Sequence, residues 1–337
     1  MKITKHILVT GGAGFIGSHL VERMLRDGKN VVVIDDLSTG SLENLRAVER
    51  SARLRIVRST ISECRELPNL AAEAEFIFHL AATVGVDLVV KSALHVLEAS
   101  FHETQILLRA AAKQLTPLLL TSTSEVYGKS AKPEFSEDDD LLIGPPGQSR
   151  WSYACSKLTD EFLALAYARE KKLPVTITRL FNTVGPRQTG RYGMVLPRFI
   201  AAAKAGKPLK VFGDGRQSRC FCLVSDVVES LVRLQKRGCD ALVADGGGDA
   251  SSPDAPRIFG EIFNIGGTEE ISILELAKLV VKTLGSKSKI ELVPYDQAYA
   301  PGFDDMRRRK PLVKKLERFV KFKPQTPLRE IIRLTAG

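Results

Sequence analysis

A tyrosine and a lysine four residues apart, Tyr153 and Lys157, form the first pair in the sequence that can carry chemistry. They stand at the start of a helical pattern that runs toward Arg169, and a spacing of four places both side chains on one helix face. A phenol with an ordinary pKa near ~10 is a poor base at neutral pH. Because a neighbouring ammonium favours the phenolate, the pair predicts a tyrosine that accepts a proton, and Lys157 can also hold a nicotinamide ribose.

A run of hydroxyl side chains at positions 121–124 follows a short apolar segment, and Glu125 comes directly after it. A hydroxyl at the carboxyl edge of a parallel sheet points into the crevice where α/β enzymes bind their ligands. We therefore predict Thr123 as a catalytic partner of Tyr153. The alternative is a polar strand end that stops at Gly128.

A glycine-rich run, Gly-Gly-Ala-Gly-Phe-Ile-Gly at 11–17, lies between an apolar segment and a helical pattern. Glycines permit the tight turn and let the backbone approach a pyrophosphate at the helix N-terminus. The next apolar run ends in Asp35, 18 residues after Gly17, where an acid binds both ribose hydroxyls and repels the 2′-phosphate of NADP. The neighbouring Asp36 competes for that role. The pattern predicts NAD as the cofactor, held by Gly11, Gly14, Phe15, Ile16, Gly17 and Asp35.

Alternating strand and helix patterns connect these residues. Apolar, β-branched runs occur at 6–10, 30–35, 54–57, 76–80, 118–121 and 175–180, with helical patterns between most of them. This alternation predicts an α/β protein with a Rossmann-type, doubly wound parallel sheet. The chain becomes less regular from about residue 185. We therefore predict an NAD-binding domain over 1–184, which includes Tyr153 and Lys157, and a smaller, mainly substrate-binding domain over 185–337, with the chain crossing back at least once. The glycines, serines and prolines at 246–256 predict a surface loop.

The composition, with 44% hydrophobic and 26% charged residues, is that of an ordinary globular protein. No run reaches the ~20 apolar residues of a membrane helix, and the first residues have no signal-peptide layout. The five cysteines are scattered without a Cys-x-x-Cys pair, so we expect reduced thiols in a cytoplasmic enzyme and no metal site.

The net charge of +10 is concentrated in one segment, because residues 307–323 hold nine basic residues and one acid. A nucleic-acid groove needs basic residues spread along a face. The pattern favours a solvated face or a clamp for a substrate's phosphates, and we expect no nucleic-acid partner.

Taken together, these motifs resemble the extended short-chain dehydrogenase/reductase family, in its nucleotide-sugar branch. The likeness rests on the glycine run, the Thr123 segment, Tyr153 with Lys157, and the runs at 79–82, 179–182, 211–216 and 263–267, and so covers nearly the whole chain. The resemblance implies tightly held NAD, a UDP-sugar beneath the C-terminal domain, and oxidation of the sugar's C4 hydroxyl, with Thr123 and Tyr153 taking its proton.

The resemblance also implies contacts at positions that no local pattern singles out. The further cofactor-binding residues are Thr60, Ile61 and Ala81. The substrate-binding residues are Ser124, Asn182, Arg191, Val211, Arg219 and Arg309. Arg219 and Arg309 are expected at the pyrophosphate, because planar guanidinium groups bind phosphate oxygens in a bidentate manner.

Ser124 stands where the resembling 4,6-dehydratases carry the aspartate that expels the C6 hydroxyl, so a dehydratase is not expected. The Thr-Ser-Glu run at 123–125 resembles the UDP-glucuronate decarboxylases that form UDP-xylose, as do Pro-Arg at 186–187 and Arg-Lys-Pro at 309–311. A C4 ketone makes the C5 carboxylate a β-keto acid, which loses CO₂ easily. Glu125 is then expected to relay a proton to C5, which makes it the fourth catalytic residue.

Two other functions remain open. The short aliphatic loop at 83–86 resembles the 4-epimerases of UDP-hexoses or UDP-uronates. A non-catalytic NAD-binding regulator would not need Thr123, Tyr153 and Lys157 together. The helical segments at 94–113 and 153–170 are rich in Ala and Leu, and in similar enzymes two such helices pair with their copies as a four-helix bundle, so we expect a homodimer.

Overall fold

The computed structural model describes residues 5–82, 93–148, 151–189, 194–245, 258–294 and 306–337. Three expectations fall on residues outside these ranges: Arg191 as a substrate ligand, the aliphatic loop at 83–86, and the surface loop at 246–256.

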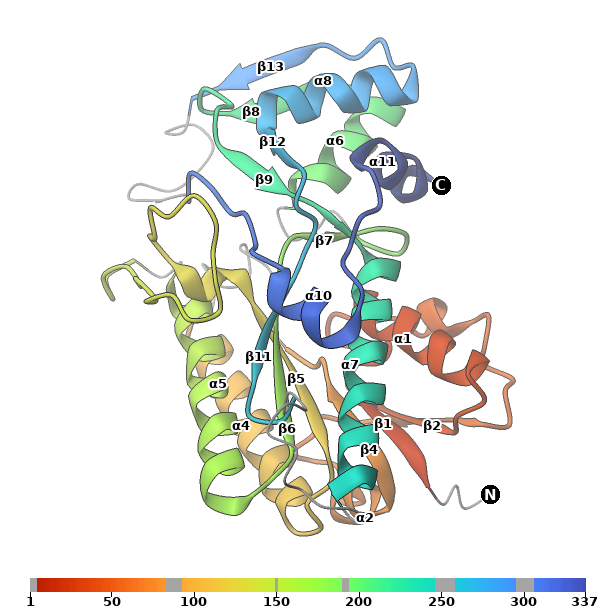
Figure 1. The fold of residues 1–337 in the computed structure, drawn as a ribbon. Helices are drawn as coiled ribbons and strands as arrows, with labels where there is room; N and C mark the ends of the chain where they lie inside the picture. The colour runs from red at the N-terminus through yellow and green to blue at the C-terminus, as the bar shows by residue number, and fades with distance from the viewer. Residues whose placement is uncertain (1–4, 83–92, 149–150, 190–193, 246–257, 295–305) are drawn as a thin grey trace.

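Seven strands of the described chain form one parallel sheet in the order β11-β6-β5-β4-β1-β2-β3 (Figure 1). The strands are β1 (His6–Thr10), β2 (Val31–Asp35), β3 (Leu54–Arg58), β4 (Ala74–His79), β5 (Leu118–Thr123), β6 (Val175–Leu180) and β11 (Ile262–Ile265). The predicted doubly wound parallel sheet is confirmed. The runs of Val, Ile and Leu form strands here because both faces of the sheet are covered by helices.

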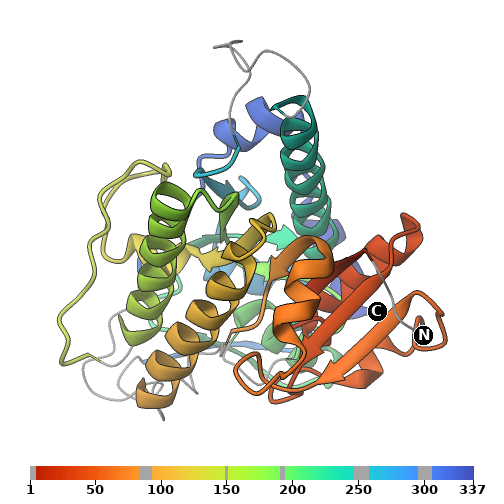
Figure 2. The ribbon, with the colours of Figure 1, turned by 90° about the horizontal axis from the view of Figure 1, so that it is seen from below.

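Helices cover the two faces of the sheet (Figures 1 and 2). One core contains Val31 and Val33 and packs against α1 (Phe15–Arg26), α7 (Val224–Asp245) and α10 (Lys314–Val320). The intervening Val32 and Ile34 face a second core under α2 (Leu67–Glu73), α4 (Ala93–Ala112) and α5 (Trp151–Lys171). This alternation follows from the two-residue period of a strand.

A smaller unit lies at the carboxyl edge of the sheet and encloses its own core (Figure 1). Its elements are α6 (Val195–Lys204), β8 (Leu209–Phe212), β9 (Ser218–Cys220), β12 (Glu270–Ser272), α8 (Ile273–Leu284), β13 (Ile290–Val293) and α11 (Leu328–Ala336). Strand β13 pairs with β8 in parallel, and β12 pairs with β9 antiparallel. Helix α8 begins where the Ser272 side chain accepts from the Glu275 amide and ends at Gly285 in the left-handed conformation, both common terminators.

The chain passes between the two units more than once. Strands β7 (Thr183–Val184) and β10 (Cys222–Leu223) pair with each other, and β11 then returns to the main sheet beside β6. Residues 307–312 form a strap: the Arg307 carbonyl accepts from Ser218 in the smaller unit, and the Lys310 carbonyl accepts from Phe135 in the larger one. The strap carries Arg309 to the carboxyl edge of β5.

Candidate active site

Tyr153 and Thr123 come together at the carboxyl edge of β5. Thr123 is the last residue of that strand, and Tyr153 lies in the first turn of α5, which packs against β5 and β6. The Thr123 hydroxyl and the Tyr153 phenol interact through their side chains, and the hydroxyl favours the phenolate form. The hydroxyl also accepts from the Glu125 amide at 3.2 Å, since it caps the one-turn helix η2 (Ser124–Tyr127). The structure thus places the predicted proton acceptor against the predicted hydroxyl partner.

The Tyr153 phenol has a pKa above its ordinary value. Burial is the main cause, and the Glu125 and Asp160 carboxylates raise the pKa further, whereas the Thr123 hydroxyl and the Arg309 charge lower it. We expected a lowered pKa from Lys157 together with the nicotinamide charge. Without a cofactor, the protein therefore holds Tyr153 as a neutral phenol. The positive charge of a bound cofactor would have to lower the raised pKa of this phenol.

Lys157 is buried beside an acid of its own helix. Its Nζ donates to Asp160 Oδ2 at 3.0 Å, and the two side chains are 3% and 0% exposed. The Lys157 charge also reaches His79, where burial first and that charge second lower the histidine pKa to about 3. His79 is thus neutral near pH 7, held between Thr10 Oγ1 at 2.7 Å and Thr104 Oγ1 at 3.0 Å.

Glu125 forms an ion pair with Arg309 from the strap. Both side chains are mostly buried, with 18% of the glutamate and 10% of the arginine exposed. Both groups also act on the Tyr153 phenol. An acid and a guanidinium thus lie together within electrostatic reach of the hydroxyl pair, which suits a site that handles a carboxylate or moves a proton.

A fully buried charge network holds α5 against the sheet, and the sequence analysis did not find it. Arg179 on β6 donates to Glu161 on α5 with Nε at 3.0 Å and Nη2 at 2.8 Å, and the two side chains are 3% and 2% exposed. The Glu161 carboxylate also accepts from Ser122, and the Arg179 guanidinium lies over the Tyr127 ring. The one sequence feature that could have indicated this network is Arg179, a charged residue inside the apolar strand at 175–180.

The glycine run forms a cradle that fits a pyrophosphate. Gly11 has φ +72°, and a Cβ there would lie 2.7 Å from the Ala81 amide nitrogen. A Cβ on Gly17 would lie 2.1 Å from the Gly11 carbonyl. Gly14 caps α1 without a side-chain hydrogen bond, and the first turn, with the partly buried Phe15 and Ile16, holds no acid. The helix N-terminus is therefore open to an anionic group.

Asp35 and not Asp36 faces this cradle. The Asp35 carboxylate is buried and accepts from the Ala13 amide at 2.8 Å and the Leu37 amide at 2.9 Å, whereas Asp36 is exposed and bonds to Ser38. Burial is the main cause that raises the Asp35 pKa. Each Asp35 oxygen keeps acceptor capacity for a ribose hydroxyl.

The other expected cofactor contacts lie at neighbouring strand ends. Thr60 and Ile61 follow β3, with the Thr60 hydroxyl bonded to Ser62 at 3.2 Å and Ile61 buried in the second core. Ala81 follows β4 and lies against Gly11. The residues present therefore fit a dinucleotide along the carboxyl edges of β1 to β4.

The expected substrate residues are divided between the two units. Ser124 is buried in η2, and the Asn182 amide donates to the Cys220 carbonyl at 2.9 Å, which ties β6 to the smaller unit. Arg219 is buried on β9, where its Nη1 donates to the Ser218 carbonyl at 2.7 Å. The Val211 side chain is fully enclosed in the core of the smaller unit, so a ligand would meet only its backbone.

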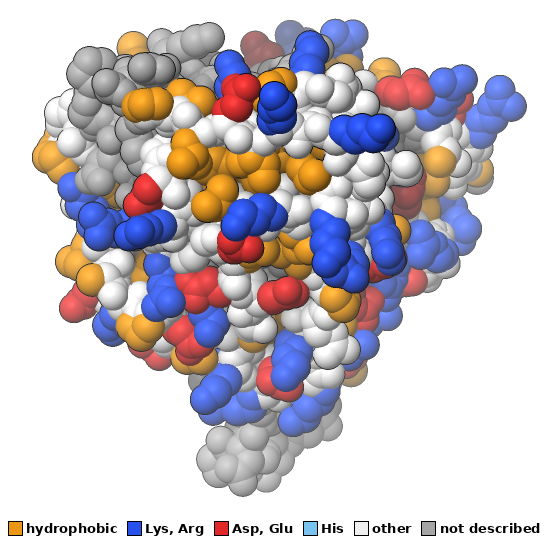
Figure 3. Space-filling view, turned by 90° about the horizontal axis from the view of Figure 1, so that it is seen from above, with side chains coloured by type: hydrophobic (Ala, Val, Ile, Leu, Met, Phe, Trp, Pro, Cys, Tyr) orange, Lys and Arg blue, Asp and Glu red, His pale blue; other side chains and the backbone are white. Residues whose placement is uncertain are grey.

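Within the described chain, five of the nine basic residues in the run at 307–323 form ion pairs, four of them with acids outside the run. Besides Arg309, the pairs are Arg308 with Glu270 at 2.6 Å, Lys310 with Glu134 at 2.7 Å, Lys315 with Glu261 at 2.6 Å and Lys323 with Glu317 at 3.4 Å. On the face seen from above, acidic and basic side chains are also intermingled (Figure 3). These ion pairs neutralise much of the positive charge that the run carries in the sequence.

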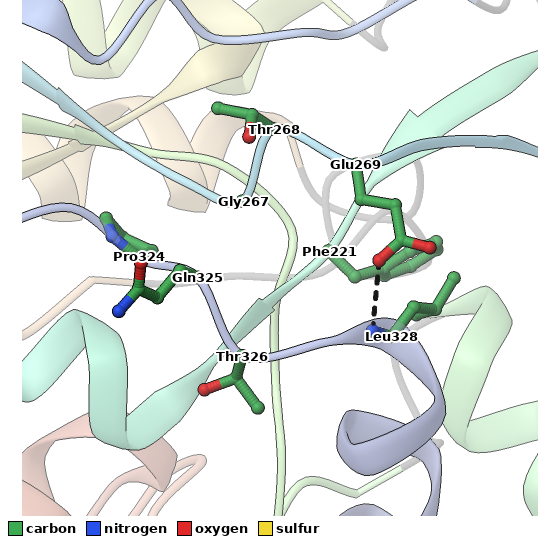
Figure 4. A pocket seen from close by; sticks show the side chains of 8 residues that line it. All are labelled: Phe221, Gly267, Thr268, Glu269, Pro324, Gln325, Thr326 and Leu328. Atoms are coloured by element: carbon green, nitrogen blue, oxygen red, sulfur yellow. Dashed lines mark hydrogen bonds between the residues drawn. The ribbon is translucent and has the colours of Figure 1, made fainter.

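A cavity of about 140 Å³ lies apart from the residues expected to do chemistry (Figure 4). It is lined by Phe221, Gly267, Thr268, Glu269, Pro324, Gln325, Thr326 and Leu328. Glu269 accepts from the Leu328 amide at 3.1 Å and so anchors the start of α11. Among the described residues no cluster of His, Cys, Asp and Glu suits a metal ion, and no described helix is long and apolar enough to span a membrane.

The profile of the NAD dependent epimerase/dehydratase family matches residues 7–266. UDP-N-acetyl-alpha-D-glucosaminuronate decarboxylase of Bacillus cytotoxicus is 40% identical, over 95% of this chain and 93% of that protein. UDP-glucuronic acid decarboxylase 4 of Arabidopsis thaliana is 34% identical, over 96% of this chain and 66% of that protein.

Among solved structures, UDP-glucuronic acid 4-epimerase from Bacillus cereus, in complex with UDP-glucuronic acid and NAD, has a TM-score of 0.82 at 29% identity, with 98% of both chains covered. The match to the family profile extends from β1 to the end of β11, so it includes the glycine cradle, Thr123, and Tyr153 with Lys157. This chain belongs to the NAD dependent epimerase/dehydratase family.

Proposed function

We propose that the chain is an NAD-dependent decarboxylase of a UDP-linked uronic acid, and that it converts UDP-glucuronate to UDP-xylose. The observation that carries the proposal is the ion pair between Glu125 and Arg309 beside the interacting side chains of Thr123 and Tyr153. The names and coverage of the two decarboxylase relatives support it.

The first step is removal of the proton from the sugar's C4 hydroxyl. Thr123 would hold that hydroxyl and pass its proton to the Tyr153 phenolate, with which its side chain interacts. Bound NAD⁺ supplies the hydride acceptor for C4 and a positive ring that favours the phenolate. Lys157, buried one turn further along α5, is placed to hold the nicotinamide ribose.

The second step breaks the bond between C5 and its carboxylate. The C4 ketone accepts the electron pair of that bond as CO₂ leaves, which gives an enolate with its carbanion character at C5. We assign Glu125 to deliver the proton to C5, and Arg309 to hold first the substrate carboxylate and then the Glu125 anion. This assignment moves Arg309 from the pyrophosphate, where we first expected it, to the uronic acid end of the site. Return of the hydride to C4, together with the proton taken up by Tyr153, would complete UDP-xylose and leave the cofactor oxidised again.

Arg219 keeps its proposed role at the pyrophosphate. It is buried on β9, within the unit that we propose binds the nucleotide. Asn182 links β6 to the same strand through the Cys220 carbonyl and would set the distance between the two units.

Two candidate substrates differ only in the substituent at C2 of the sugar. UDP-glucuronate and UDP-N-acetylglucosaminuronate share the C4 hydroxyl and the C5 carboxylate, and the second is the substrate named for the relative from Bacillus cytotoxicus. The proposed residues act on C4 and C5 and so serve either sugar.

A 4-epimerase is the alternative, supported by the likeness to the Bacillus cereus enzyme. Epimerisation at C4 needs no proton donor at C5. The experiment is therefore to incubate the purified protein with each UDP-uronate and follow the products by mass spectrometry. Loss of CO₂ supports the decarboxylase, whereas an isomer of unchanged mass supports the epimerase. Release of NAD on denaturation without either reaction would favour a regulator.

We also propose that the protein is a cytoplasmic homodimer. Helices α4 and α5 lie side by side (Figure 2) and leave Leu94, Leu97, Phe101 and Phe162 at least 38% exposed, which a four-helix bundle with a second copy would cover. The free state of the five cysteines supports a reducing compartment. Light scattering that gives a mass near 37.0 kDa at micromolar concentration would exclude the dimer.

A further inference from the structure

Asp160 is the most deeply buried carboxylate near the proposed site, and the mechanism above gives it no role. The residue is 0% exposed, and its Oδ2 accepts both from Lys157 at 3.0 Å and from the Ser100 hydroxyl of α4 at 2.9 Å. Within the described residues, its second oxygen, Oδ1, is buried without a hydrogen-bond partner. The carboxylate is therefore fixed between two helices but only half satisfied.

Stability does not account for such an arrangement. A buried ion pair is often no more stable than apolar side chains of the same volume, and a buried acceptor without a partner costs free energy. The positions along α5 suggest another reason. Tyr153, Lys157 and Asp160 follow one another at spacings of four and three, so they share one face of the helix within two turns.

We propose that Asp160 is a positioning residue for the hydride-transfer site: its carboxylate fixes the Lys157 ammonium and balances its charge beside Tyr153. The inference rests on the proposed function, since it concerns the same tyrosine. The sequence patterns indicate only Tyr153 and Lys157 of α5 as partners in this step. The proposal adds the negatively charged Asp160 to them.

Among the described residues, the charged groups that act on the Tyr153 phenol come from η2, the strap and α5. Glu125 from η2 raises the phenol pKa, Arg309 from the strap lowers it, and Asp160 raises it. His79 on β4, beside Lys157, has its pKa lowered to about 3 and stays neutral over the working range. When Asp160 loses its charge, the positive charge of Lys157 is no longer balanced, and the phenolate becomes more favourable.

The size of the effect follows from the helix. Seven residues separate Asp160 from Tyr153, which corresponds to about 10 Å of helix rise. A unit charge at that separation, with an effective dielectric constant of about 20, changes the phenol pKa by about one pH unit.

The test compares Asp160→Asn with Ser100→Ala in the NAD-loaded protein. The phenol of Tyr153 is titrated by near-ultraviolet difference absorbance against the same chain carrying Tyr153→Phe, which needs no substrate. We expect Asp160→Asn to lower the Tyr153 pKa by about one pH unit and to move the acid limb of kcat with UDP-glucuronate by the same amount. Ser100→Ala removes a hydrogen bond between the same two helices but no charge, so its titration should match the wild type.

Three outcomes overturn the proposal: an Asp160→Asn pKa within about a third of a pH unit of the wild type, a rise instead of a fall, or an equal change in Ser100→Ala. If Asp160→Asn does not fold, the neutral variant Asp160→Ser replaces it, and a Tyr153 pKa within about a third of a pH unit of the wild type again overturns the proposal. Because the titration is independent of turnover, its result stands even if the reaction is not a decarboxylation.

Discussion

Replacing Glu161 by glutamine should destabilise the protein strongly, because it leaves a buried guanidinium without its counter-charge. Arg179 donates to both oxygens of Glu161, and both side chains are almost completely buried. Removing one partner of a buried pair typically costs about 3–5 kcal/mol. With an unfolding entropy of about 2.1 cal/mol/K per residue, a chain of 337 residues that unfolds as one unit should lose roughly 4–7 °C in Tm.

Thermal unfolding followed by circular dichroism measures this change. The matched control is Lys278→Gln, which breaks an exposed pair with Glu275 of similar length, 2.7 Å, and should cost less than about 0.5 kcal/mol. In the double variant Glu161→Met/Arg179→Met no charge is stranded, so its loss should be smaller than that of Glu161→Gln. A Tm for Glu161→Gln within about 1 °C of the wild type, or a double variant as unstable as the single one, would refute the reasoning.

Four further predictions concern the site. Tyr153→Phe should lower turnover by about 10²–10⁴ while NAD stays bound, as released nucleotide will show; activity above about a tenth of the wild type means that another group is the base. Glu125→Gln should lower UDP-xylose formation by at least ~10² with NAD content unchanged, measured by mass spectrometry, and near-normal formation contradicts its role at C5. Arg219→Ala should weaken UDP binding by calorimetry without altering NAD content, and an unchanged affinity places the clamp elsewhere. For His79, the folded pKa is about 3, lowered by burial and by the charge of Lys157. The unfolded chain takes up this proton near ~6.5, so acid favours unfolding, and urea titrations should show the wild type losing about 2 kcal/mol more than His79→Gln between about pH 7 and pH 5.

Local patterns were sufficient to predict the main sheet and part of the site. The strands at 6–10 and 175–180 have the bounds that we expected, because apolar periodicity and glycines at element ends act over a few residues. The glycine run and Asp35 also belong to one strand–turn–helix–strand unit, so their spacing along the chain already fixes how close they lie. The same holds for Tyr153 and Lys157, whose separation of one helical turn follows from the sequence alone.

Only the tertiary structure decided which charged residues meet. Glu125 follows β5 whereas Arg309 lies in the strap, and the pairing of Glu161 with Arg179 depends on how α5 packs against β6. A charge in a sequence indicates neither its partner nor its burial, because an ion pair forms between groups that the whole fold brings together. The run at 307–323 is the clearest case: in the sequence it is a basic cluster, and in the structure Arg308, Arg309, Lys310 and Lys315 of this run pair with glutamates from both units.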